Sequence, residues 1–305
     1  MYLYHFGLSE LPFGLTPDTS FFCELEGHIE ALNVLKVAIE SGEGFIKITG
    51  EVGTGKTLLC RQLLNDYEQK FLCAYLPNPY LSPDELRISL ATELGLKLSK
   101  RIDQFRLIER ISRKLIQSHK SGKPVILLVD EAQALPDETL EALRLFTNLE
   151  TEKRKLLQVV LFGQPELEAR LAEKKLRQLR QRITFSYNLK PLNYEQTVNY
   201  VHHRINAAKI QKEEDANENV ICFTKGAMKK IFQYSRGIPR LINILSHKSL
   251  LLAYGKNKYE IDKKTIYRAA KDTDDVSTSK FMKLFSNAAL ISVTVLSMIA
   301  LGFLK

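Results

Sequence analysis

One short segment constrains the fold of this chain more than any other. Residues 50–57 read Gly-Glu-Val-Gly-Thr-Gly-Lys-Thr and complete the pattern GxxxxGK[ST]. A β-prone run at 44–49 precedes the segment, and an apolar, helix-compatible run at 58–64 follows it. In this strand–loop–helix setting the glycines let backbone N–H groups turn toward a phosphate, and the helix N-terminus adds its positive end. The segment therefore predicts a nucleoside triphosphate site.

The side chains of this loop have separate predicted roles. Lys56 is expected to neutralise the β- and γ-phosphates, and the Thr57 hydroxyl to hold Mg²⁺. The alternative, an incidental glycine-rich turn before a helix, does not explain both flanks. The predicted nucleotide-binding residues of the loop are Gly50, Glu51, Val52, Gly53, Thr54, Gly55, Lys56, Thr57 and Leu58.

A second motif follows about 70 residues later in the chain. The apolar run 124–129 is typical of a buried strand in a parallel sheet, and it ends in Asp130 and Glu131. Ligands bind at this edge of open α/β sheets. Asp130 is predicted to hold Mg²⁺ through a water, and Glu131 to orient or activate the attacking water. The second carboxylate favours hydrolysis over transfer to a small molecule, although a strand that merely ends in solvated acids is the alternative. Without a guanine signature, ATP is favoured over GTP.

Length and composition agree with an ordinary globular protein that has a large and a small domain. The chain has 305 residues, of which 45% are hydrophobic and 26% charged. Its four cysteines form no CxxC pair and its six histidines have no metal-ligand spacing, so neither a disulfide framework nor a zinc site is expected. The first residues lack the pattern of a signal peptide.

Alternating β-prone and amphipathic runs predict an α/β fold: a three-layer αβα P-loop NTPase domain with a parallel sheet over residues 1–190, including an N-terminal lead at 1–43. Helical patterns dominate after Pro191 and predict a small helical lid domain at 191–271. The polar segment 272–284 is predicted to be a linker.

The segment 285–304 contains no charged residue. As a helix it would be about 30 Å long, the thickness of the hydrocarbon core of a bilayer. Lys280 and Lys283 precede it and Lys305 follows, so we expect a single-pass anchor in the bacterial inner membrane with the ATPase domain in the cytoplasm. A buried core helix or an interfacial hairpin is the alternative.

Several motifs occur in a characteristic order: the phosphate loop, Asp130-Glu131-Ala132-Gln133, 162–167, 176–183 and 237–243. With the lead Phe6-Gly7-Leu8, they make residues 4–270 similar to the AAA+ ATPases of the general secretion pathway protein A type. The short chain with its apolar end most resembles the branch that serves MSHA pilus biogenesis. Secretion relatives continue into a periplasmic peptidoglycan-binding domain, which we do not expect in a chain that stops at Lys305.

The resemblance implies further site residues. Gln164 matches the sensor-1 position and Arg240 the sensor-2 arginine, which would reach ATP from the lid. An arginine supplied by a neighbouring subunit would complete the site, with Arg182 ranked first, Arg180 second and Arg177 third. The alternatives are a polar strand cap for Gln164, a solvated arginine for Arg240 and a basic helix face for the others. A trans arginine implies a homo-oligomer, with a hexameric ring as one form.

The resemblance also implies a membrane-anchored ATPase that drives or regulates assembly of a type IV (MSHA-like) pilus or secretion machinery, with inner-membrane assembly proteins as partners. The net charge of +9 and a pI near 9.2 keep a DNA-acting, transposition-helper ATPase as an alternative, with Lys174, Lys175 and Arg177 on phosphates. Against DNA binding, the excess positive charge is expected to be spread along the chain, and no helix-turn-helix, zinc-finger or RRM signature stands out. The predicted membrane anchor also argues against it, because a DNA remodeller gains little from a bilayer anchor. A slow, nucleotide-switched scaffold is a third possibility, which the presence of Glu131 disfavours.

Overall fold

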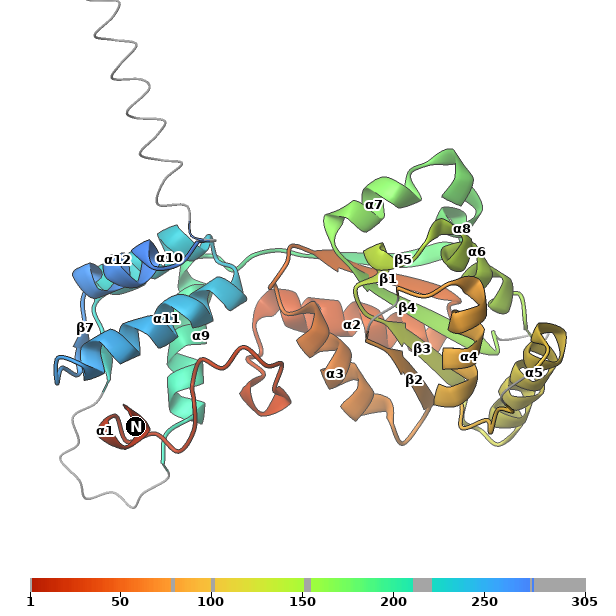
Figure 1. Ribbon diagram of the computed structural model, residues 1–305, viewed down its shortest axis with the longest axis horizontal. Helices are drawn as coiled ribbons and strands as arrows, with labels where there is room; N and C mark the ends of the chain where they lie inside the picture. The colour runs from red at the N-terminus through yellow and green to blue at the C-terminus, as the bar shows by residue number, and fades with distance from the viewer. Residues whose placement is uncertain are drawn as a thin grey trace, which may run out of the picture. The chain divides into compact units, whose positions relative to one another are not determined.

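The computed structural model describes residues 2–77, 80–99, 102–150, 155–210, 221–274 and 276. The chain divides into two compact units (Figure 1). An α/β unit spans Thr16–Pro191, and a helical unit combines Met1–Leu15 with the chain from Leu192 onward.

The α/β unit contains a five-stranded sheet in the order β2-β3-β4-β1-β5, and every pair of neighbours is parallel. The predicted α/β fold with a parallel sheet is therefore confirmed. The strands are β1 (Phe45–Gly50), β2 (Leu72–Leu76), β3 (Val125–Val129), β4 (Leu157–Gly163) and β5 (Ile183–Leu189).

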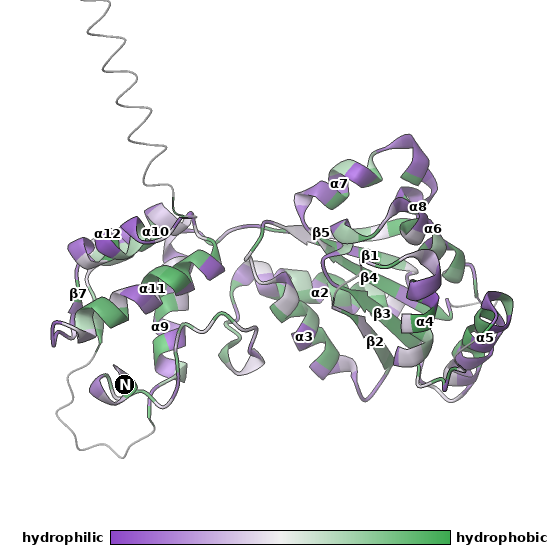
Figure 2. Ribbon diagram, in the orientation of Figure 1, coloured by the Kyte–Doolittle hydropathy of each residue, from purple (hydrophilic) through white to green (hydrophobic). Residues whose placement is uncertain are grey.

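Helices cover both faces of the sheet because its central strands are apolar on both sides (Figure 2). In β3, Val125, Leu127 and Val129 belong to one buried cluster, whereas Ile126 and Leu128 belong to the other. The second cluster is closed by α2 (Glu26–Ser41) and α3 (Lys56–Tyr67). The first is closed by α4 (Pro83–Glu93), α5 (Gln104–Lys120), α6 (Asp137–Phe146), α7 (Pro165–Leu171) and α8 (Arg177–Arg182).

Short 3-10 turns complete the α/β unit at Thr19–Phe21, Ala132–Ala134 and Lys174–Leu176. After α8 the chain forms a fifth strand, β5. It pairs in parallel with β1, in register from Ile46↔Phe185 to Gly50↔Leu189. No strand was predicted here from the sequence. The partly exposed alternation of Ile183–Leu189 is the pattern of an edge strand.

The helical unit consists of five helices and a two-stranded sheet within the described residues. The helices are α1 (Tyr2–His5), α9 (Tyr194–Ala207), α10 (Lys225–Ser235), α11 (Pro239–Tyr254) and α12 (Lys263–Lys271), and the short parallel strands are β6 (Cys222–Phe223) and β7 (Glu260–Ile261). Leu241 and Leu245 of α11 pack with Ala269 and Ala270 of α12 in its core.

The first residues of the chain pack with the helical unit. Ser9 donates its backbone N–H to the carbonyl of Ala208 at 2.8 Å, and Asn243 donates from Nδ2 to the carbonyl of Gly14 at 3.2 Å. The segment predicted as one N-terminal lead, 1–43, is thus shared between the two units, with the division at Leu15.

The predicted anchor, 285–304, and most of the predicted linker, 272–284, lie outside the described residues. Among the helices that are described, none combines the length and the apolar character needed to cross a bilayer. The anchor therefore stays a prediction from the sequence.

Candidate active site

The phosphate-binding loop joins the end of β1 to the start of α3. Gly53 and Gly55 have φ values of 80° and 104°, in the left-handed region that glycine adopts without strain. A Cβ at Gly50 would lie 2.7 Å from the carbonyl oxygen of Leu189, so only glycine fits there. Glu51 and Val52 are exposed at the loop, and Leu58 is half-buried in the first turn of α3. The glycines thus have the backbone conformation that a phosphate-binding loop requires.

Lys56 is the first residue of α3 and its side chain is held against the loop. Its Nζ donates hydrogen bonds to the carbonyl oxygens of Gly50 at 2.8 Å and Glu51 at 2.9 Å. Burial lowers the pKa of Lys56, while the carboxylates of Glu131 and Asp130 act in the opposite direction. The ammonium group is therefore positioned over the loop and beside both acidic residues.

Thr57 and Asp130 come together as the sequence predicts. The Thr57 hydroxyl donates to Oδ2 of Asp130 at 2.7 Å, and the backbone N–H of Glu131 donates to Oδ1 at 2.9 Å. Asp130 is only 3% exposed, and this burial raises the pKa of its carboxyl, which the two hydrogen bonds oppose. A hydroxyl and a carboxylate side by side next to a phosphate cradle are the oxygen donors that Mg²⁺ prefers. The residues present therefore fit a bound nucleotide and its magnesium ion.

Glu131 has an unusual backbone and a constrained side chain. Its φ of 51° lies in the left-handed region, which is uncommon for a residue with a side chain and often occurs at functional sites. Its Oε2 accepts hydrogen bonds from Nε2 of Gln164 at 2.8 Å and from Nε2 of Gln133. The carboxylate is thus fixed by two amides at the end of β3.

Gln133 was not among the predicted site residues, although it connects several of them. Its Oε1 accepts the backbone N–H of Gln164 at 3.0 Å, and its carbonyl accepts Nη1 of Arg170 at 2.6 Å. Arg170 also forms an ion pair with Asp137 at the start of α6. The sequence feature that could have indicated Gln133 is its position two residues after Glu131, in the turn that carries the carboxylates.

His28 of α2 is a second residue that the sequence analysis missed. It is buried beneath the loop, its Nε2 lies 3.2 Å from the carbonyl oxygen of Thr54, and a Cβ at Gly55 would lie 2.8 Å from the same nitrogen. Phe22 packs edge-on against the imidazole. Burial lowers the pKa of His28, and the bond to Thr54 opposes this shift. A neutral imidazole thus supports the loop from below.

The predicted trans arginines do not join the site of their own chain. Arg182 directly precedes β5, and Ile183 pairs with Phe45 at the start of β1, whereas the phosphate loop follows Gly50 at the end of that strand. Five strand residues correspond to about 16 Å. Arg180 is exposed on α8, as is Arg177, and Arg182 is half-buried. Their role in a neighbouring subunit stays a prediction.

Arg240 lies in the helical unit, as the second residue of α11, and it is exposed. Gly237 before it has a φ of 74°, and a Cβ there would lie 1.9 Å from the carbonyl oxygen of Leu192. Packing against Leu192 within the helical unit therefore explains why a glycine is needed at position 237. The contact of Arg240 with nucleotide stays a prediction.

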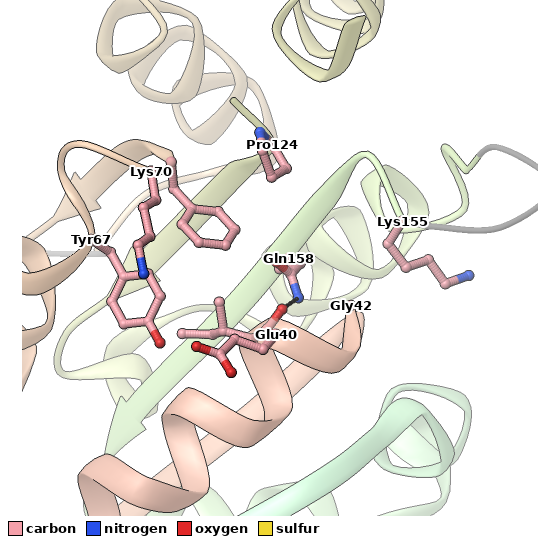
Figure 3. Close-up of a pocket in the computed structure, with 9 residues that line it drawn as sticks. Glu40, Gly42, Tyr67, Lys70, Pro124, Lys155 and Gln158 are labelled. Atoms are coloured by element: carbon pink, nitrogen blue, oxygen red, sulfur yellow. Dashed lines mark hydrogen bonds between the residues drawn. The ribbon is translucent and has the colours of Figure 1, made fainter. Parts of the chain in front are cut away.

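A hollow lies at the other edge of the sheet (Figure 3). It is lined by residues at the N-terminal ends of the strands and the ends of α2 and α3, including Lys70, Pro124 and Gln158. Gln158 closes its base by donating from Nε2 to the carbonyl oxygen of Ile39 at 3.0 Å. None of its lining residues belongs to the phosphate loop, so the hollow is separate from the predicted nucleotide site.

Comparison with known proteins agrees with the geometry. An AAA domain profile matches residues 39–171. General secretion pathway protein A of Aeromonas hydrophila is 39% identical over 276 residues, which cover 90% of this chain and 49% of that protein. The chain thus spans about half the length of this relative.

Solved structures share the fold at low sequence identity. Cdc6p from Pyrobaculum aerophilum has a TM-score of 0.65 at 16% identity, over 86% of this chain and 70% of that one. The ORC1 protein of Aeropyrum pernix in complex with DNA has a TM-score of 0.58 at 15% identity, over 81% and 64%. The RuvB Holliday junction branch migration motor of Thermotoga maritima has a TM-score of 0.54 at 15% identity, over 86% and 74%. These likenesses show the fold alone.

Proposed function

Since this chain is an AAA+ ATPase related to general secretion pathway protein A, we propose that it is anchored in the bacterial inner membrane and drives or regulates assembly of a secretion or type IV, MSHA-like pilus machinery. One observation carries the hydrolytic part. The Glu131 carboxylate is held by Gln164 beside the Thr57–Asp130 pair and the buried Lys56, at the edge of the sheet where the phosphate loop lies.

The substrate is proposed to be ATP. Mg²⁺, held by Thr57 and Asp130, would neutralise charge on the phosphate oxygens. Lys56 stabilises the charge that develops on the β- and γ-phosphates. Glu131 orients a water for attack on the γ-phosphorus and accepts its proton, while the bond to the bridging oxygen breaks and ADP leaves. Gln164 keeps the carboxylate in position, and Arg240 is proposed to contact the γ-phosphate.

Assembly is part of this proposal. The edge position of Arg182, opposite the phosphate loop of its own chain, agrees with a role in a neighbouring subunit. A homo-oligomer, such as a hexameric ring, would bring that arginine to the next active site. An isolated subunit should then hydrolyse ATP slowly.

The membrane role rests on the uncharged segment 285–304 and on the relationship to a secretion pathway protein. An anchor would hold the ATPase beside membrane-embedded assembly proteins.

The experiment that tests the proposal measures ATPase rate against protein concentration. The full chain in liposomes is compared with the chain truncated after Ser279, and duplex DNA is added in a parallel series. We expect the rate per subunit to rise cooperatively with concentration, to be higher for the anchored chain and to be indifferent to DNA.

Two other results would replace the proposal. Strong stimulation of the truncated chain by DNA would assign it to the DNA-acting, transposition-helper class. ATP binding without turnover at any concentration, in liposomes as well, would indicate a nucleotide-switched scaffold.

A further inference from the structure

Positive charge is concentrated in the helical unit. Its described residues include fourteen lysines and arginines and six aspartates and glutamates. Over its full sequence, residues 1–15 and 192–305, the unit has eighteen lysines and arginines and eleven aspartates and glutamates, so it carries an excess of seven of the net charge of +9 of the whole chain. The expectation of an even spread along the chain is therefore wrong.

Within that unit, the charge gathers on α12 and the adjoining side of α10. Neither helix contains an aspartate or glutamate. In α12, Ile266, Ala269 and Ala270 are buried, and the opposite side presents Lys263, Lys264, Tyr267, Arg268 and Lys271, all exposed. We call this exposed side of α12, together with Lys230 of α10, the cationic face. Hydrophilic and hydrophobic residues alternate along both helices in Figure 2, as expected for helices with one buried side.

The two helices form one continuous surface. The side chain of Lys263 lies 3.7 Å from the position of a Cβ at Gly226, so the starts of the helices are in contact. Further along, Lys230 stands over the ring of Tyr234 with its Nζ 5.4 Å from the centroid. Tyr267 is close enough to Tyr234 to raise its pKa, after the larger effect of burial. Cations and tyrosines thus alternate across the surface.

The cations of the face are not neutralised by the protein itself. Within the described ranges, none of them forms an ion pair. The acids that flank α12 have other partners: Asp262 accepts the backbone N–H of Thr265 at 2.8 Å, and Asp272 pairs with Lys248 at 2.9 Å. The face therefore carries positive charge without an ion-pair partner among the described residues.

We propose that the cationic face binds the anionic surface of a lipid bilayer. The chain continues from Lys271 through 272–284 to the uncharged segment 285–304, and the intervening residues span at most about 50 Å. Juxtamembrane lysines and arginines are attracted to anionic headgroups, and tyrosine suits the interface because its ring is apolar and its hydroxyl polar. The choice of a bilayer as the anionic surface rests on the proposed anchor. The experiments below test the anchor and the binding of the cationic face separately.

The test reconstitutes the full chain into neutral phosphatidylcholine vesicles or vesicles that also contain anionic phosphatidylglycerol. An amine reagent then labels exposed lysines, and mass spectrometry compares Lys263 and Lys264 with Lys97 and Lys120 of the α/β unit. We expect labelling of Lys263 and Lys264 to slow at least fivefold in anionic vesicles, with Lys97 and Lys120 unchanged. High salt should remove the difference because it screens exposed charges. Equal labelling in both vesicles would overturn the proposal.

Two variants sharpen the result. Combined Lys263→Gln, Lys264→Gln and Arg268→Gln substitutions should abolish the slower labelling of Lys230 in anionic vesicles. The matched control, with Lys97→Gln, Arg106→Gln and Lys120→Gln, removes the same charge from exposed positions of the α/β unit and should keep it. Loss of protection in both variants would point to net charge rather than to this face.

Two further measurements separate the alternatives. Flotation with neutral vesicles tests the anchor alone, so a chain that does not float with them would overturn the proposed anchor. Labelling with anionic vesicles would still show whether the cationic face binds anionic lipid. Duplex DNA is added to the chain in detergent micelles. Stronger protection of Lys263 and Lys264 by DNA than by anionic vesicles would assign the face to nucleic acid instead.

Discussion

Gln164 and Glu131, which follow the neighbouring strands β4 and β3, are joined by a hydrogen bond of 2.8 Å from Nε2 of the glutamine to Oε2 of the glutamate. The bond fixes the carboxylate that is expected to orient water. Gln164 is also the residue that directly precedes α7, so its backbone position is set by the start of that helix. The glutamine is thus a positioning residue for hydrolysis.

Replacing Gln164 by Ala should slow turnover more than it weakens binding. A hydrogen bond to a charged group contributes about 1.5–3 kcal/mol, so kcat should fall about 10- to 100-fold. ATP affinity, measured with a fluorescent analogue, should change little. Gln164→Asn should recover part of the rate only if the amide itself matters. An equal loss of affinity and kcat would show that Gln164 holds the loop instead.

Substitutions of Lys56 and Glu131 are expected to impair different steps, nucleotide binding for the first and hydrolysis for the second. Lys56→Ala removes the ammonium group that lies on the phosphate loop, so nucleotide binding should be lost. Glu131→Gln keeps the shape of the side chain but removes the base, so kcat should fall about 10²- to 10⁴-fold with affinity retained. Equilibrium binding and single-turnover rates distinguish the two. The assigned division of roles is wrong if both variants lose binding alike.

Arg182 should act only between subunits. Since it lies at the opposite edge of the sheet from its own phosphate loop, Arg182→Ala and Lys56→Ala subunits are defective at different sites. Mixing the two inactive variants should restore activity at composite sites, whereas mixing Glu131→Gln with Lys56→Ala should not, because both changes lie in the same site. Repeating the mixture with Arg180→Ala and Arg177→Ala shows which arginine is used. No recovery with any of the three would exclude this arginine cluster as the trans group.

The nucleotide motifs could be placed from the sequence because their chemistry is local. Residues 50–57 need only a strand before them and a helix after them, and a buried strand ends in Asp130. The contacts of Gln133 and His28 depend instead on tertiary packing: His28 precedes the loop by more than twenty residues and reaches Thr54 only when α2 packs on the sheet. Sequence spacing carries no signal for such a contact.

The edge strand β5 was missed for a different reason. The alternation in Ile183–Leu189 is present in the sequence, but its polar residues Thr184, Ser186 and Asn188 make it weaker than the continuous apolar runs of the central strands. The grouping of residues 2–15 with the helical unit could not be read from local patterns. It depends on long-range bonds, such as those from Arg204 to the carbonyl oxygens of Pro12 and Gly14.

Gly237→Ala should destabilise the helical unit. Its φ is positive, and a methyl group added there would place its carbon 1.9 Å from the carbonyl oxygen of Leu192, where there is no room for it. We expect a loss of about 1–3 kcal/mol in the free energy of unfolding. Gly14→Ala is a matched control in the same unit, since a Cβ there meets nothing within 4 Å. Hydrogen exchange of α9 and α11 amides localises the effect. An unchanged unfolding midpoint for Gly237→Ala would mean that the turn rearranges freely.

His28 should make stability depend on pH. Burial lowers its pKa in the folded protein below the unfolded value of about 6.5, so the unfolded state binds the proton first as the pH falls. The contribution to stability is therefore complete above about pH 6.5 and is lost as the pH falls through the folded pKa, with a slope of at most about 1.4 kcal/mol per pH unit. His28→Gln keeps an N–H donor for the Thr54 carbonyl oxygen and cannot titrate.

Urea unfolding measured from pH 7.5 to pH 5 checks this dependence. The free energy of unfolding of the natural chain should fall relative to that of His28→Gln in the acidic part of the range, and ATP affinity should fall with it because the loop loses its support. The exposed His202→Gln should follow the natural chain. Parallel curves for the natural chain and His28→Gln would mean that His28 binds its proton equally well in the folded and unfolded states, which would contradict a pKa lowered by burial.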